Sequence, residues 1–206
     1  MITLDNIPTK NKSSTVGIGN KNTVIVTNWI DSVNRESLYK RRGGTYNRFP
    51  HFLISKKGYI FQLLDLKQSS GILKNVLPDV IIIGIENNGY LSKINDTYIN
   101  KYGQKIPKHY NITEFDWRTQ KFWDNYTSSQ EEKLAFLINY LSITAKIPPK
   151  LQQTNIYIKD TIKNGFFYIT NISKEYLDMN PNWNYKKVTK LVDEYREKNN
   201  IPNKRT

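Results

Sequence analysis

Residues 80–86 read VIIIGIE, and this stretch decides the fold. The run from Val80 to Ile85 consists of β-branched apolar side chains and one glycine, Gly84, with no polar residue among them. Such a run is typical of a strand that is covered on both faces, at the centre of a sheet. The stretch therefore predicts a sheet with further strands beside it.

The segments on either side supply those strands. Residues 23–27 (TVIVT) form a second short β-branched run, residues 51–55 and 59–64 flank a Lys-Lys-Gly turn, and residues 165–169 (GFFYI) form another strand candidate. Helices are expected over 32–42, which ends at Gly43-Gly44, and over 129–146 and 184–197. The alternation predicts one α/β domain with a mixed central β-sheet flanked by helices.

The helix at 129–146 has the clearest pattern. Ser128 and Glu131 have the spacing of a capping box. A single apolar stripe follows, formed by Leu134, Leu137, Ile138, Leu141 and Ala145. By contrast, residues 87–126 are aromatic and punctuated by Gly and Asn, which favours a long loop with a small hairpin, of the kind that often covers a site.

The chain divides into a polar N-terminal arm (1–21), the main domain (22–200) and a C-terminal tail (201–206). No apolar run approaches the roughly 20 residues that a membrane span requires, and no secretory signal is visible. The sequence holds no cysteine, which excludes disulfides and thiolate metal sites.

The 206 residues carry 31 basic and 18 acidic side chains, a formal charge of +13. This charge favours an anionic partner, such as a cell-wall polymer, nucleic acid or an acidic protein surface. The lysines and arginines are scattered rather than gathered in one element, so a merely solvated basic surface is an equal alternative.

Four stretches, in this order, carry a resemblance to a known family: HFLISKKGYIFQLLD (51–65), IIIGIENNG (81–89), YINKYGQKIP (98–107) with the helix that follows it, and ITNISKEYLDMNP (169–181). Together they resemble the N-acetylmuramoyl-L-alanine amidases, whose fold is shared with peptidoglycan recognition proteins. The match runs from about Thr23 to Trp183, and its third stretch with the helix resembles the inserted hairpin and long helix of many phage and bacterial members. If the chain is phage-encoded, we expect it in the virion or the host cytoplasm.

The resemblance implies a zinc ion held by two histidines and an Asp or Cys, with its bound water activated for hydrolysis. Carried over, the first histidine falls on Thr27, the second on Ile169 and the last ligand on Asp178. The lysine that some members have two residues earlier is Tyr176. A hydroxyl, a hydrocarbon and one carboxylate do not make a tight zinc site, so no cofactor is expected.

Other family positions keep their residue types. Glu86 stands where some members have a general acid/base, and His51 corresponds to a supporting residue. These two, with Asp178 and His109, are in principle enough donors for an unorthodox metal site. The alternatives are a structural hydrogen bond for Glu86, a turn cap for Asp178 and a surface histidine at 109.

The sequence thus favours an amidase-fold protein without zinc ligands, which binds peptidoglycan or another anionic wall polymer or is otherwise phage-associated. His51, Trp117, Trp123 and Tyr176 are the candidates for its binding groove. One alternative is a virion or tail component that reuses the fold, with virion proteins as partners. Others are an active amidase with unorthodox ligands, and a nucleic-acid-binding module.

Overall fold

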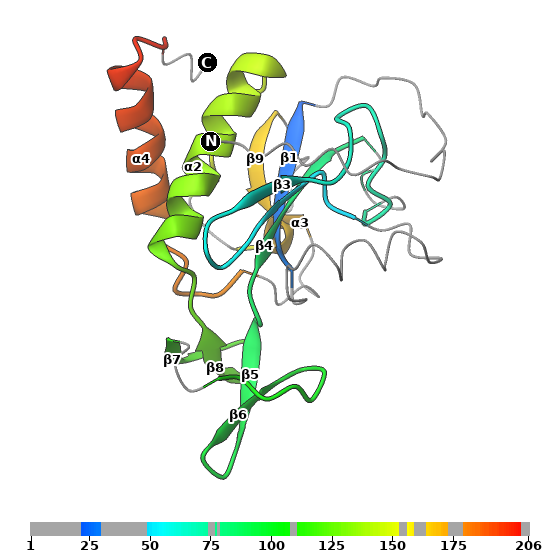
Figure 1. The fold of residues 1–206 in the computed structure, drawn as a ribbon, viewed down its shortest axis with the longest axis vertical. Coiled ribbons are helices and arrows are strands. Elements are labelled where there is room, and N and C mark those ends of the chain that lie inside the picture. Colours follow the sequence, from blue (N-terminus) through cyan, green and yellow to red (C-terminus); the bar gives the residue numbers. More distant parts are fainter. Residues whose placement is uncertain are drawn as a thin grey trace.

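A five-stranded mixed sheet organises the protein (Figure 1). The computed structural model describes residues 22–29, 49–73, 77, 79–107, 111–152, 156–158, 164–172 and 179–202. The strand order is β3-β2-β4-β1-β9. The bounds are β1 Thr23–Trp29, β2 Phe52–Ile54, β3 Ile60–Gln62, β4 Ile81–Glu86 and β9 Gly165–Tyr168.

The central place of β4 confirms the expectation drawn from VIIIGIE. It lies between β1 and β2 and is parallel to both, with Val26 opposite Ile83 and Ile54 opposite Ile85. β9 adds a further parallel strand beside β1. β3 returns antiparallel to β2, which confirms the predicted hairpin.

Helices α2 (Ser128–Thr144) and α4 (Tyr185–Lys198) stand on one side of this sheet, with α4 packed on the outside of α2 (Figure 1). Every second residue of β1 and β4 points into the core between the sheet and α2. The stripe predicted for α2 is buried there, apart from Ala145, which is only partly buried. On α4, Val188 and Val192 are buried, whereas Leu191 is partly covered and Tyr195 is exposed.

The start of α2 lies one residue earlier than predicted. Thr127 is the N-cap: its hydroxyl accepts from the Gln130 backbone N–H, and the Gln130 side chain accepts from the Thr127 N–H. The Ser128–Glu131 capping box is therefore wrong. Glu131 instead forms a 2.6 Å ion pair with Lys187 of α4, which ties the first turns of the two helices together.

Within the described residues, loops and one short helix cover the opposite face of the sheet. One apolar cluster there is built on Phe49, Leu53 and Leu63. A second one gathers around the short helix α3 (Ile169–Ile172) and the loop before β4; its buried members are Ile25, Leu73, Val80, Ile82 and Ile169. The strand predicted to run through Ile169 thus ends at Tyr168.

The long loop predicted between 87 and 126 is wrong. This segment forms a second, antiparallel sheet of order β6-β5-β8-β7, which projects from one end of the main domain (Figure 1). Its strands are β5 Tyr90–Ile94, β6 Thr97–Asn100, β7 Ile112–Trp117 and β8 Gln120–Asp124. The strands are short and largely polar, and β7 contains a bulge. They therefore lack the apolar alternation by which a strand is recognised in a sequence.

Gly165 is a backbone position that no other residue suits. Its φ is +129°, and a Cβ at this site would lie 2.7 Å from the carbonyl oxygen of Lys150. That oxygen is held in place because it accepts the Phe166 N–H at 2.9 Å. The strained φ and the fixed backbone contact would therefore both lower the stability of a variant with a side chain at this position.

We expect Gly165→Ala to lower the free energy of unfolding by about 3 kcal/mol. Gly103→Ala is the matched control, since Gly103 also has a positive φ (+78°) but has no atom within 4 Å of a new Cβ. It should cost about 1 kcal/mol. Urea unfolding of both variants measures the difference, and equal losses would show that Lys150 moves aside.

The predicted helix 32–42, the arm 1–21 and most of the tail 201–206 lie outside the described residues. Within the described part of the chain, none of the helices combines the length and the apolar character that crossing a membrane takes.

Candidate functional site

The carboxyl ends of the parallel strands β1, β2, β4 and β9 meet along one edge of the main sheet. In open α/β sheets this is the edge where ligands usually bind. Thr27 is near the end of β1, Glu86 ends β4 and Ile169 directly follows β9. The topology thus brings together three of the positions singled out in the sequence.

Thr27 and Ile169 lie side by side. Each is one residue beyond the pair Val26 and Tyr168, which are opposite each other in β1 and β9. Alternation along β1 and β4 places Thr27 and Glu86 on the face away from α2. Thr27 is 4% and Ile169 2% exposed.

These residues do not fit a zinc ion. The Ile169 side chain is a hydrocarbon buried among Ile25, Leu73 and Ile82, and Thr27 offers a neutral hydroxyl. Zinc needs His, Cys or carboxylate ligands. Among the described residues no three His, Cys, Asp or Glu side chains gather closely enough to hold a metal. Asp178, Tyr176 and His109 lie outside the described residues.

Glu86 is held by the neighbouring strand. Its carboxylate Oε2 accepts the backbone N–H of Lys56 at 2.7 Å, just beyond the end of β2. Its own carbonyl oxygen accepts from the side chain of Gln130 in α2, also at 2.7 Å. The residue is partly buried. Glu86 therefore connects β4 to β2 and α2. It has a structural role independent of any role in catalysis.

His51 lies at the other end of the sheet. It is fully buried; Nδ1 accepts the backbone N–H of Ile82 at 3.0 Å, and Nε2 donates to the carbonyl oxygen of Gln68 at 2.9 Å. These two bonds fix the neutral tautomer and occupy both ring nitrogens. His51 fastens the start of β2 to β4 and does not reach the edge that carries Glu86.

A buried ion pair that the sequence did not indicate joins the two sheets. Lys56 Nζ lies 2.8 Å from Asp124 Oδ1, with Lys56 13% and Asp124 0% exposed. The other carboxylate oxygen of Asp124 accepts from the backbone N–H and the side-chain amide of Asn88, at 2.9 and 2.8 Å. Lys56 Nζ also donates to the carbonyl oxygen of Asn125. Asp124 is thus fully engaged at the junction.

Burial lowers the pKa of Lys56 below its ordinary value, and the nearby carboxylates of Asp124 and Glu86 offset part of that shift. The ammonium group is costly to bury unless its partners remain in place. We call Lys56, Asn88, Asp124 and Asn125, together with Asn180, the junction network. Asn180 donates to the carbonyl oxygen of Asp124 at 2.9 Å.

The two tryptophans proposed for the groove lie in the second sheet. Trp123 has no exposed surface; its ring packs against Tyr90 and Trp117, and its indole N–H donates to the carbonyl oxygen of Phe115. Trp117 is partly exposed, with the Arg118 guanidinium 4.6 Å from the centre of its ring. Trp123 supports the sheet, while Trp117 keeps some surface for contact.

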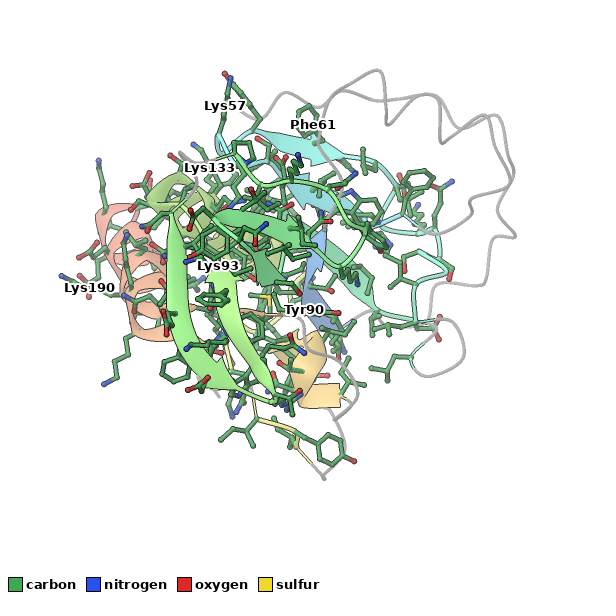
Figure 2. The ribbon with its side chains drawn as sticks, turned by 90° about the horizontal axis from the view of Figure 1, so that it is seen from below. Lys57, Phe61, Tyr90, Lys93, Lys133 and Lys190 are labelled. Carbon is green, nitrogen blue, oxygen red and sulfur yellow. The ribbon has the colours of Figure 1, made fainter. Side chains whose placement is uncertain are left out.

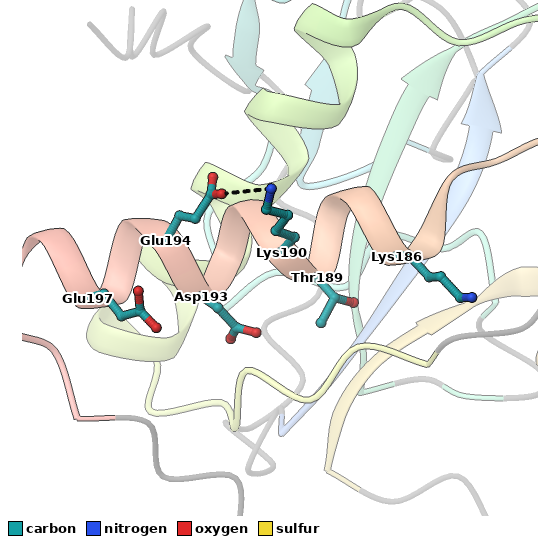
Figure 3. A pocket seen from close by; sticks show the side chains of 6 residues that line it. All are labelled: Lys186, Thr189, Lys190, Asp193, Glu194 and Glu197. Atoms are coloured by element: carbon teal, nitrogen blue, oxygen red, sulfur yellow. Dashed lines mark ion pairs between the residues drawn. The ribbon is translucent and has the colours of Figure 1, made fainter.

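A hollow elsewhere on the protein lies along the outside of α4. Lys186, Thr189, Lys190, Asp193, Glu194 and Glu197 line it (Figure 3). Lys190 and Glu194 form an exposed ion pair of 3.4 Å across one helical turn. All six residues come from this one helix, and none of the candidate residues borders the hollow.

Comparison with known proteins finds similar solved structures, among them two from Clostridium intestinale URNW. The N-acetylmuramoyl-L-alanine amidase LysC is 14% identical, with a TM-score of 0.47 over 89% of this chain and 87% of its own. The endolysin N-acetylmuramoyl-L-alanine amidase LysCS is 14% identical, with a TM-score of 0.48 over 89% of this chain and 86% of its own. No protein-family model and no curated protein matches the chain. The functional argument therefore rests on the residues themselves.

Proposed function

We propose that this chain is an amidase-fold protein that has lost its zinc ligands, and that it binds peptidoglycan or another anionic cell-wall polymer without cleaving it. One observation carries the proposal. Thr27 in β1 and Ile169, the first residue of α3, directly follow the paired residues Val26 and Tyr168. Glu86 lies on the same face of the sheet. This arrangement supports the matching that the sequence resemblance implies, in which a hydroxyl and a hydrocarbon stand where the family has histidines.

Without a metal the site has little means to hydrolyse an amide. A lone general acid or base accelerates a reaction by about 10²–10⁴-fold, and the Glu86 carboxylate already accepts a backbone N–H. Next to Thr27, the space above Gly84 is filled by Leu53, Pro50 and Trp29, whose atoms would lie 3.1–3.4 Å from an added Cβ. This packing favours a surface that binds over a pocket that activates water.

The charge of the chain supports an anionic partner. The formal charge of the sequence is +13. Within the described residues, Lys57, Lys93, Lys133 and Lys190 are examples of basic side chains from different elements (Figure 2). A net charge of this size attracts polyanions over several ångströms. This attraction weakens as the salt concentration rises. Wall polymers that carry phosphate groups are ligands of this kind.

Purified peptidoglycan sacculi test the proposal directly. We expect the protein to sediment with sacculi at low salt, to bind less when their anionic polymers are removed, and to release no new amino termini. An excess of added zinc should not start the reaction. Release of free L-alanine amino groups would instead establish an active amidase, and failure to sediment with either form of sacculi would refute wall binding.

A further inference from the structure

The outer part of the second sheet leaves aromatic side chains at the surface. A sheet of this size normally buries one of its faces against a core. Here only the end near the main domain is buried, through Leu91, Asn100, Trp123 and Asp124. Figure 2 looks onto this sheet from below, with Tyr90 and Lys93 of β5 labelled.

Tyr98 and Phe122 form an aromatic pair on one face. Their ring centres are 5.3 Å apart in an edge-to-face arrangement. Lys93 lies opposite Tyr98, while Leu91 lies opposite both Asn100 and Phe122, so these side chains point to the same side of the sheet. Both rings are partly exposed. We call this surface the Tyr98–Phe122 face.

Charged groups of both signs border the two rings. Lys93 Nζ is 5.7 Å from the Tyr98 ring centre, and Lys121 Nζ is 5.7 Å from that of Phe122. Lys121 also pairs with Glu114 at 2.8 Å, and both of these side chains are more than half exposed. The rings are thus flanked by donors and acceptors that can reach a bound molecule.

The charge balance of this sheet differs from that of the whole chain. Residues 87–107 and 111–126 carry five basic side chains and four carboxylates, against 31 and 18 in the full sequence. A polyanion is held by an excess of Lys and Arg, which this sheet lacks. Flat rings with a rim of mixed polar groups suit an uncharged polyhydroxy ligand, whose C–H faces stack on rings while its hydroxyls bond to the rim.

We infer that the Tyr98–Phe122 face binds the sugar strand of the wall polymer, through its neutral acetamido sugars. This inference rests on the proposed function and assigns the contacts with the sugars to a second surface, apart from the edge that holds Thr27 and Glu86. The junction network fixes the base of the sheet to the main domain, so the face is held in place before a ligand arrives.

The test uses an N-acetylglucosamine oligosaccharide as the probe and compares three proteins by calorimetry. Relative to the unchanged chain, Tyr98→Ala with Phe122→Ala should weaken binding by about tenfold or more, because both stacking rings are lost. Tyr59→Ala removes a ring that is 58% exposed on the main domain, and should leave the affinity unchanged. Circular dichroism of all three verifies that they are folded.

A further variant, Lys93→Glu, separates the ligand classes. It should change oligosaccharide affinity by less than about threefold, whereas a single-stranded DNA oligomer held on this face would lose most of its binding. Tighter binding of DNA than of the oligosaccharide to the unchanged chain, abolished in the ring variant, would overturn the inference in favour of nucleic acid. Equal oligosaccharide binding by the ring variant would also overturn it.

Sedimentation of the ring variant with peptidoglycan sacculi tests this inference separately from the proposed function. If the ring variant still sediments with sacculi as the unchanged chain does, the Tyr98–Phe122 face is not the binding surface, although wall binding stands. If the unchanged chain does not sediment, the proposed function itself fails.

Discussion

Replacing Asp124 with asparagine should lower the free energy of unfolding by about 3–5 kcal/mol. The substitution keeps the shape of the side chain but leaves the ammonium group of Lys56 buried opposite a neutral amide. It also weakens the hydrogen bonds from Asn88, because a carboxylate is the stronger acceptor. Chemical denaturation of the two proteins at neutral pH measures the difference.

The matched control is Glu114→Gln, which removes the charge of an exposed pair in the same sheet. It should change stability by at most about 0.5 kcal/mol, since exposed pairs contribute little. Lys56→Met together with Asp124→Asn completes a double-mutant cycle and should cost less than the two single changes added. A loss of under 1 kcal/mol for Asp124→Asn would show that the buried pair does not fasten the two sheets.

Thr27→His combined with Ile169→His should create zinc binding that the unchanged chain lacks. Adjacent strands are about 4.8 Å apart, and both positions directly follow the paired residues Val26 and Tyr168 of β1 and β9. Two imidazoles at this spacing can share one zinc at about 2.0–2.1 Å from each nitrogen. Asp178 is the third ligand that the family resemblance implies. The change costs stability in the absence of metal, because it places a polar ring among Ile25, Leu73 and Ile82.

Thermal unfolding of this double variant at increasing zinc concentrations measures the gain in stability on zinc binding. At a zinc concentration 1,000 times the dissociation constant, binding adds about 4 kcal/mol of stability. Thr27→His alone is the control. Zinc should change its stability little, since a single new histidine leaves the set of zinc ligands incomplete. A folded double variant that binds no zinc would show that the matching of these positions to the amidase ligands is wrong.

The sequence predicted the main sheet well because its strands carry local information. The runs at 23–27 and 80–85 are rich in β-branched residues with apolar centres, and both became buried parallel strands. The apolar stripe beginning at Leu134 correctly predicted α2. Capping was predicted one residue too late, because Thr127 and Ser128 are both suitable N-cap residues and only the helix geometry distinguishes them.

The second sheet was missed for the opposite reason. Its strands have four to six residues and are exposed on most of their surface, so no apolar alternation marks them. The residue types at the candidate edge were visible in the sequence, including Thr27 and Ile169 at the positions where the resemblance places metal ligands. Their side-by-side arrangement required the pairing of β1 with β9, which are separated by most of the chain.

The sequence by itself determined the mixed α/β sheet, its buried core strands and the residue types at the matched ligand positions. These follow from local apolar patterns and from the identity of single residues. Only the tertiary structure decided that His51 is sealed between Ile82 and Gln68, and that Lys56 pairs with Asp124, 68 residues away. Polar partners of this kind have no sequence period, because the path of the chain brings them together and burial then makes their pairing obligatory.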